Sequence, residues 1–378
     1  MSAPTILISA GEASSDMYAA RLATALRART GARLFGMGGS RMAEAGVELV
    51  ADSREVAVVG LSEALGKISS VISVQRRLTR EAGQRHASLA ILVDSPSTHL
   101  GVARRLKKID VPVGYFIGPQ IWAWRAGRIR AIRRLVERMV VIFPFEERIY
   151  RDAGVPVDFV GHPLVDTVRP TMGRTEFASH YGLDAARPIV TLLPGSRPNE
   201  ISRNYPPLLE ACERLAHGTG RAGKIQFIHA AAPGLSADLF LQYARPGLQV
   251  KGIEGATYEA LAAADCAIVA SGTATVEAAL LGTPMVVIYR VASASAVVLR
   301  RMIRIPFISM VNLIAGRRLV PELIQDEFTP AAVESEVRRL LESPAACEEM
   351  RGGLAEVRTK LGPSGAIERA ADIFARMI

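Results

Sequence analysis

Apolar runs of strand length alternate with segments of helical spacing along the chain, and the alternation starts afresh about half-way. Within these runs the apolar residues are continuous, which is typical of strands buried on both faces of a parallel sheet. In the first half we expect strands at 5–10, 33–37, 89–93, 111–116 and 139–143, with a helix over 15–28 after the first strand. The pattern predicts an α/β fold in which helices cover both faces of a doubly wound sheet.

A turn-rich stretch around 161–187 precedes the second round of the pattern. There we expect strands at 188–193, 224–230, 266–270 and 284–288, with a helix over 199–216 after the first strand. The length of 378 residues also suits two domains. We expect Rossmann-like domains at 1–168 and 185–345, followed by helices at 346–378 that could pack back on the first domain. Ligands of such folds lie beyond the carboxyl ends of the strands, here in a cleft that the two domains face.

The chain is basic, with 46 Lys and Arg against 37 Asp and Glu and a formal net charge of +9. Such a surface attracts nucleic acids, anionic lipids or phosphorylated substrates, and composition alone does not choose among them. Aromatic residues make up only 6% of the chain, and no nucleic-acid motif is recognisable, so we expect no nucleic-acid partner. The three cysteines are far apart in the sequence and indicate a reducing compartment.

The first strand ends in a turn of small residues that opens a helix, Gly11–Asp16. Backbone N–H groups at such a turn suit an anionic ligand, and an ordinary turn with a serine N-cap explains the same residues equally well. The candidate ligands here are Gly11, Glu12, Ser14, Ser15 and Asp16. Because the turn is not a G-x-G-x-x-G fingerprint, a nicotinamide cofactor is disfavoured.

Asp94 comes directly after the buried strand at 89–93, which puts an acid at the edge of the cleft. There it could act as a general base if it reaches the hydroxyl that it deprotonates. Taken alone, an N-cap or a partner of a nearby arginine is the more ordinary role.

Both tryptophans of the chain lie in the segment 118–125. The candidate ligands here are Gln120, Trp122 and Trp124, since aromatic faces pack against sugars or acyl chains. Core packing explains the tryptophans equally well.

Two strand ends of the second half carry phosphate-type turns. The first, 193–200, joins a helix amino terminus to Arg197, and arginine adds a bidentate donor to helix-end amides. The second, 270–277, offers Ser271, Gly272 and Thr273, with Glu277 one turn further along, where it could accept from ribose hydroxyls. Either turn alone would fit a capped helix, but two in one half favour a pyrophosphate site.

Several catalytic signatures are absent from the sequence. No Asp-x-Asp pair, H-E-x-x-H, G-x-x-x-x-G-K-[ST] or G-x-S-x-G occurs. We therefore expect neither a metal nor a cofactor, and an ATPase, a zinc hydrolase and a serine esterase are disfavoured.

Over nearly its whole length the sequence resembles the lipid-A-disaccharide synthase family, inverting glycosyltransferases of the GT-B architecture. The segments that carry the resemblance are 119–124, 161–163, 193–197, 271–277, 312–317 and 321–325. The sequence departs from the family pattern at Ser15, where glycine is usual, and at Ser97-Thr98-His99, where Asp-Phe-Asn is frequent. Gly118 stands where serine is common, and these departures concern the acceptor side more than the donor side.

The resemblance implies a reaction that joins UDP-2,3-diacylglucosamine to 2,3-diacylglucosamine 1-phosphate (lipid X). The products are a β-1′,6-linked disaccharide 1-phosphate and UDP. It adds Asn312 and Arg317 to the substrate-binding candidates. It also makes Asp94 the expected general base, with Glu12, Asp16 and, more weakly, His99 as rivals.

The resemblance further implies a protein on the cytoplasmic face of the inner membrane. The amino terminus lacks the basic region of a signal peptide, and no stretch reaches the roughly 18 apolar residues that span a bilayer, so we expect peripheral contact with anionic lipid. Residues 56–74 are apolar and fit an interfacial segment, an acyl groove or a buried helix. The sequence is also compatible with a homodimer.

The nearest rival is another GT-B enzyme of UDP-sugars, such as a UDP-N-acetylglucosamine 2-epimerase or a murein-type transferase. These share phosphate turns at strand ends. The segments 122–124 and 312–317 speak against both.

Overall fold

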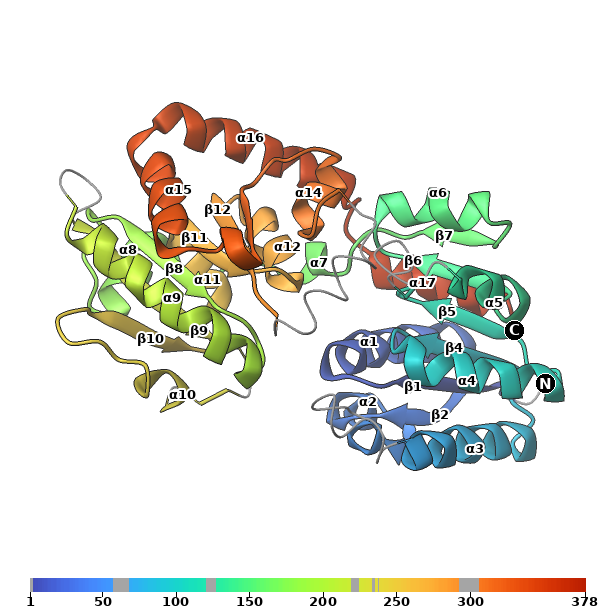
Figure 1. The fold of residues 1–378 in the computed structure, drawn as a ribbon. Helices are drawn as coiled ribbons and strands as arrows, with labels where there is room; N and C mark the ends of the chain where they lie inside the picture. Colours follow the sequence, from blue (N-terminus) through green and yellow to red (C-terminus); the bar gives the residue numbers. More distant parts are fainter. Residues whose placement is uncertain are drawn as a thin grey trace. The chain divides into compact units, whose positions relative to one another are not determined.

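The chain folds into two compact units, the first made of residues 1–163 and 361–378 and the second of residues 164–360. The structure, a computed structural model, describes residues 3–56, 68–119, 127–218, 224–232, 235–236, 238–291 and 306–378. Figure 1 shows the elements of each unit. Each is a parallel sheet between layers of helices.

The first unit contains a seven-stranded sheet in the order β3-β2-β1-β4-β5-β6-β7. Its strands are β1 (Thr5–Ala10), β2 (Arg33–Gly38), β3 (Glu48–Asp52), β4 (Leu89–Val93), β5 (Val113–Phe116), β6 (Arg138–Val141) and β7 (Val157–Phe159). All paired strands run parallel. Its helices are α1 (Ala13–Thr30), α2 (Ser40–Glu44), α3 (Ile68–Gln84), α4 (Pro96–Leu106), α5 (Arg128–Leu135), α6 (Pro144–Asp152) and α17 (Ala366–Ala375), with 3-10 turns at Ser53–Glu55 and Lys107–Ile109.

Helices α3, α4 and α5 pack side by side on one face of this sheet, over a core that includes Val74, Leu78, Leu100 and Ile132. The terminal helix α17 packs against α1 (Figure 1). There Arg29 of α1 pairs with Glu368 at 2.6 Å and with Asp372 at 2.5 Å.

Residue 114 of β5 shows how closely α17 fits the sheet. A Cβ atom on Gly114 would lie 2.5 Å from the Phe374 ring, so a larger residue there would displace the helix.

The second unit contains a six-stranded parallel sheet in the order β10-β9-β8-β11-β12-β13. Its strands are β8 (Ile189–Leu193), β9 (Gln226–Ala231), β10 (Val250–Glu254), β11 (Cys266–Ala270), β12 (Met285–Tyr289) and β13 (Glu322–Ile324). Its helices are α7 (Leu164–Thr167), α8 (Arg174–His180), α9 (Pro198–Ala216), α10 (Asp238–Leu241), α11 (Thr257–Ala263), α12 (Thr273–Leu280), α14 (Met310–Ala315), α15 (Pro330–Glu342) and α16 (Pro344–Lys360), with a 3-10 turn at Gln325–Glu327.

The predicted fold class is confirmed, since both units are doubly wound and the second sheet has the strand order of a Rossmann fold. Helix α16, which falls largely within the terminal helices predicted at 346–378, packs on α12, α14 and α15. Of those terminal helices, only α17 falls within the first unit. Residues 57–67 of the apolar segment 56–74 lie outside the described residues, and residues 68–74 form the start of α3.

Candidate functional site

In each sheet the strand order reverses beside the first strand of its unit, between β1 and β4 and between β8 and β11. Ligands of open α/β sheets bind outside the carboxyl ends of the strands at such a switch point. The turns after these four strands hold most of the sequence candidates: Gly11–Asp16, Asp94, Gly195–Arg197 and Ser271–Thr273. Each unit therefore offers a site at its switch point.

Asp94 follows β4 in a backbone conformation that is rare for residues other than glycine. Its φ is +51° and that of Ser95 is +48°, so two successive residues lie in the left-handed region. Such residues cost roughly 1–3 kcal/mol each, and Ser95 also directly precedes a proline, which further disfavours helical conformations of Ser95. Strain of this kind concentrates at functional sites.

The Asp94 carboxyl is largely buried, and its pKa is raised to about 6. Burial is the main cause, the negative charge of Glu12 adds to it, and a hydrogen bond from the Ser95 backbone opposes it. A carboxyl with a pKa in this range is suited to general-base chemistry near neutral pH.

Two side chains hold the Asp94 carbonyl oxygen. The Tyr115 hydroxyl donates to it at 2.5 Å and His99 Nδ1 donates to it at 2.7 Å. The other ring nitrogen of His99 lies 2.9 Å from Ser9 Oγ. Burial lowers the pKa of His99 to about 4, so the ring is neutral and both its nitrogens are engaged.

The turn after β1 is held by its own side chains. Glu12 is the N-cap of α1, and the buried Ser15 hydroxyl donates to Glu12 O at 2.8 Å and accepts from Glu12 N at 3.0 Å. The buried Asp16 carboxylate accepts backbone N–H bonds from Gly39, Arg41 and Met42 at 2.6 to 3.4 Å. Of the candidates in this turn, Glu12 and Ser14 are exposed.

Gly11 at the same turn is enclosed by the loop that follows β4. A Cβ atom at Gly11 would lie 2.6 Å from Ser95 Oγ, so the turn and the Asp94–Ser95 segment are in direct contact. Among the described residues, the buried Ser95 Oγ has no hydrogen-bond partner.

In the second unit, Arg197 is the N-cap of α9 and its side chain is 69% exposed, so it is available to a ligand. Glu200, one turn further along, orders this turn by accepting from Ser196 N at 2.9 Å and pairing with Arg197 at 3.2 Å. We did not single out Glu200 from the sequence, although it lies within the segment 193–200.

The turn after β11 exposes Gly272 and Thr273, while Ser271 is half-buried and donates to Ile308 O at 3.2 Å. Glu277 lies one turn inside α12. Burial raises its pKa to about 7, against the opposing effect of a hydrogen bond from Tyr258. With this pKa, the Glu277 carboxyl is only partly ionised near neutral pH, and it lies beside the amino terminus of α12.

Asn312 lies inside a buried network. Its amide donates to Val320 O at 2.9 Å and to Glu322 Oε1 at 2.8 Å, and its oxygen accepts from Leu319 N and Val320 N. Glu322 also accepts from Ser309 N and Ile308 N. The network therefore fixes residue 308, whose carbonyl receives the Ser271 hydroxyl.

Comparison with known proteins identifies the family. The sequence model described as lipid-A-disaccharide synthetase matches residues 6–364. The chain belongs to the lipid-A-disaccharide synthase family. It is 46% identical to the lipid-A-disaccharide synthase of Myxococcus xanthus over 371 residues, which cover 98% of this chain and 96% of that protein.

Solved structures share the fold with this family member at low sequence identity. The UDP-GlcNAc 2-epimerase of Neisseria meningitidis bound to UDP-GlcNAc superposes with a TM-score of 0.66 at 14% identity, over 98% of each chain. The glycotransferase of kitacinnamycin superposes with a TM-score of 0.62 at 16% identity, over 99% of each chain. The GT-B architecture is thereby confirmed.

Some of the site residues predicted from the sequence lie away from the two switch points or outside the described residues. Arg317, between α14 and β13, pairs with Glu356 of α16 at 2.8 Å and is half-exposed. Gln120, Trp122 and Trp124 lie outside the described residues. Over the described ranges, the chain has no cluster of three or more metal-ligating side chains and no helix long and apolar enough to cross a membrane.

Proposed function

We propose that the protein transfers the 2,3-diacylglucosamine unit of its UDP derivative to the 6-hydroxyl of lipid X. The products are the β-1′,6-linked disaccharide 1-phosphate of lipid A biosynthesis and UDP. The observation that carries the proposal is the family match across both units, residues 6–364. No hydride or acyl transfer is involved, so the chemistry needs only binding, a base and stabilisation of the departing UDP.

The second unit binds the UDP-sugar at the β8–β11 switch point. Helix-end amides and the exposed Arg197 suit the diphosphate, with the hydroxyls of Ser271 and Thr273 beside it. Glu277, one turn inside α12, accepts from the ribose hydroxyls. These donors take over the charge of departing UDP without a metal ion, and Asn312 and Arg317 support this side of the site.

Asp94 of the first unit is the general base that takes the proton from the acceptor 6-hydroxyl. Its rivals are less suited: Asp16 is occupied by three backbone N–H groups, and His99 is neutral with both ring nitrogens engaged. Glu12 is exposed and remains the alternative base. Its charge already contributes to the raised pKa of Asp94. Gly11, Ser14, Ser15, Gln120, Trp122 and Trp124 remain proposed acceptor-side residues.

UDP release measured with both lipid substrates tests the proposal. UDP should appear only when donor and acceptor are both present. Asp94→Asn should lower kcat by about 10²–10⁴-fold while UDP affinity stays nearly unchanged. Arg197→Ala should weaken UDP binding, whereas Arg214→Ala, at the far end of the same helix α9, should not. Near-normal kcat in Asp94→Asn would move the role of base to Glu12.

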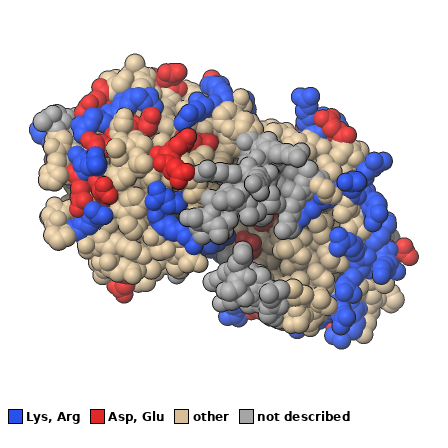
Figure 2. Space-filling model, viewed as in Figure 1, with Lys and Arg blue, Asp and Glu red and all other residues tan. Residues whose placement is uncertain are grey.

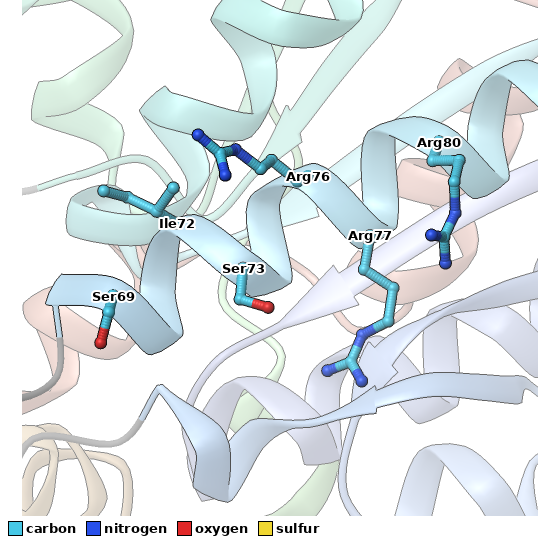
Figure 3. Close-up of a pocket in the computed structure, with 6 residues that line it drawn as sticks. All are labelled: Ser69, Ile72, Ser73, Arg76, Arg77 and Arg80. Carbon is cyan, nitrogen blue, oxygen red and sulfur yellow. The ribbon is translucent and has the colours of Figure 1, made fainter.

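We also propose a cytoplasmic protein that binds the anionic inner membrane through the first unit and is able to form a homodimer. Figure 2 shows Lys and Arg side chains gathered along one flank of that unit. Exposed Lys and Arg side chains lie on α3, α4 and α5, which cover one face of the first sheet, and on the turn after α4. They are Arg76, Arg80, Arg104, Lys107, Lys108, Arg130, Arg133 and Arg134. Three arginines of α3, Arg76, Arg77 and Arg80, line a pocket with Ser69, Ile72 and Ser73 (Figure 3).

A further inference from the structure

The segment Asp94–Ser95 holds two successive left-handed residues at the first switch point, and three elements converge on it. The Asp94 N–H donates to Phe116 O at 3.0 Å, which extends the β4–β5 ladder by one bond. Beyond that bond the chain enters the left-handed region, and Pro96 then begins α4. Regular sheet or helix bonding does not account for this conformation.

The Asp94 carbonyl is instead held by side chains from elements that are distant in sequence. Tyr115 of β5 and His99 of α4 donate to the same oxygen at 2.5 and 2.7 Å. Ser9 of β1 holds the far nitrogen of His99 at 2.9 Å. All three side chains are buried, and the two rings contact each other edge to face.

Because the Asp94 carbonyl is held by these hydrogen bonds, the direction of the Asp94 carboxyl is restricted as well. The carbonyl and the side chain leave adjacent atoms of one residue, so fixing the 94–95 peptide plane limits the directions that the carboxyl can take. If the carbonyl were released, Asp94 and Ser95 could relax to the extended conformation that is usual before a proline and at an N-cap. The carboxyl would then turn away from its present position.

We infer that Ser9, His99 and Tyr115 are positioning residues that hold the Asp94 backbone in its left-handed conformation and so aim the carboxyl at the acceptor hydroxyl. The inference rests on the proposed role of Asp94 as general base. His99 acts here as a neutral hydrogen-bonding ring and takes no proton during the reaction. Tyr115 acts through its hydroxyl alone, since its ring belongs to the core.

The chain offers variants that separate this role from general stability. Tyr115→Phe removes the donor and keeps the ring. His99→Leu removes the second donor, whereas His99→Asn restores an N–H donor at the position of Nδ1. Ser88→Ala is the matched control, because Ser88 also donates to a backbone carbonyl, that of Thr5, but stands at the opposite end of β4.

The test is kcat and KM for each variant, in the native chain and in the Asp94→Asn background, with folding checked by thermal unfolding. In the native chain Tyr115→Phe and His99→Leu should lower kcat roughly 10–100-fold with KM nearly unchanged, as for a reacting group displaced by about 1 Å. His99→Asn should recover most of kcat, and Ser88→Ala should retain it. In the Asp94→Asn background Tyr115→Phe should cost nothing further.

The possible failures are distinguishable. If Asp94→Asn alone keeps near-normal kcat, the proposed base is wrong and the inference falls with it. If Asp94→Asn is slow but Tyr115→Phe and His99→Leu are as fast as the native chain, only the positioning role is overturned. Equal losses from Tyr115→Phe in both backgrounds would also overturn it, because the hydroxyl would then act independently of Asp94.

Discussion

Asp94 is held at the switch point of the first unit at a cost to the stability of the fold. Two left-handed residues cost roughly 1–3 kcal/mol each, and the two hydrogen bonds to the Asp94 carbonyl return about 1 kcal/mol each. The buried carboxylate adds a further cost, since burial and Glu12 both disfavour its charged form. A residue kept under such conditions is typical of a functional group rather than of a helix cap.

The raised pKa predicts that Asp94→Asn stabilises the protein at pH 8. The folded state holds a proton on Asp94 up to about pH 6, whereas the unfolded chain releases it near its ordinary value of 3.8. The native carboxyl therefore lowers stability progressively as pH rises from about 4 to about 6, and by a constant amount above that. Asparagine avoids this cost and tolerates the left-handed backbone. We expect a gain on the order of 1–3 kcal/mol at pH 8 and almost none at pH 4, measured by thermal unfolding.

Asp110→Asn is the control for that measurement, because Asp110 is also left-handed, with φ +55°, but is exposed. It should change stability little at either pH. A gain in Asp94→Asn that is the same at pH 4 and pH 8 would show that the carboxyl charge is not its cause.

At the residue scale, the sequence predicted the positions of polar residues in the fold but not their hydrogen-bond partners. An acid after a buried strand is visible in the sequence, which placed Asp94 at a strand end. The bonds of Asp16 to residues 39–42 and of Asn312 to residues 319–322 depend on how distant turns pack. Likewise, no local pattern revealed that Tyr115 and His99 share the carbonyl of Asp94 as acceptor.

At the scale of elements, α14 and β13 are joined through one buried carboxylate. Glu322 Oε1 accepts from Ser309 N, Ser309 Oγ and Asn312 Nδ2, and Oε2 accepts from Ile308 N. Asn312 in turn ties the loop at Leu319 and Val320. The Glu322 carboxylate thus supplies hydrogen bonds between α14 and β13 that regular helix or sheet structure does not provide there.

Glu322→Ala should therefore destabilise the protein by roughly 3 kcal/mol, because several buried donors lose their acceptor at once. Chemical denaturation of the purified protein measures the loss. Glu327→Ala, which removes an exposed acid from the turn after β13, should be nearly neutral. Equal stability of the two variants would mean that water replaces Glu322 at no cost.

The strands that the sequence did not predict are the edge strands of the two sheets: β3, β7, β10 and β13. Central strands such as β4 are buried at every residue and read as continuous apolar runs, whereas β10 has a single buried residue and β7 has none. An edge strand is covered on fewer sides, so its sequence carries less of the apolar signal. The ends of predicted strands moved by a few residues, as in β6, which ends at Val141 rather than 143.

At the scale of the whole molecule, the first six strands of each unit have the same order, and β7 extends the first sheet by one strand. This order gives each unit one switch point. This much followed from the two rounds of strands and helices in the sequence, because continuous apolar strands separated by helices pair in parallel. How the chain divides was less accessible. The sequence predicts helices from residue 346 that could pack back on the first domain. In the structure the first unit includes only residues 361–378 of them, where α17 packs on α1, and nothing local to these residues marks that boundary.

The distribution of charge predicts that membrane binding depends on the first unit. Arg133→Glu with Arg134→Glu, on the exposed face of α5, should weaken flotation with anionic vesicles at low salt, since each basic residue near the surface contributes about 1 kcal/mol. Lys251→Glu with Arg351→Glu makes the same change of charge on exposed positions of the second unit and should leave flotation intact. Equal losses in the two double variants would mean that net charge alone governs binding.

The most direct test of the account is the structure of the product formed from UDP-2,3-diacylglucosamine and lipid X in the presence of EDTA. Mass spectrometry and NMR should identify a tetraacyl disaccharide 1-phosphate with a β-1′,6 linkage, formed with release of one UDP. UDP-N-acetylglucosamine offered alone should be returned unchanged. Epimerisation of that soluble sugar nucleotide, or a lipid product with a different linkage, would contradict the account.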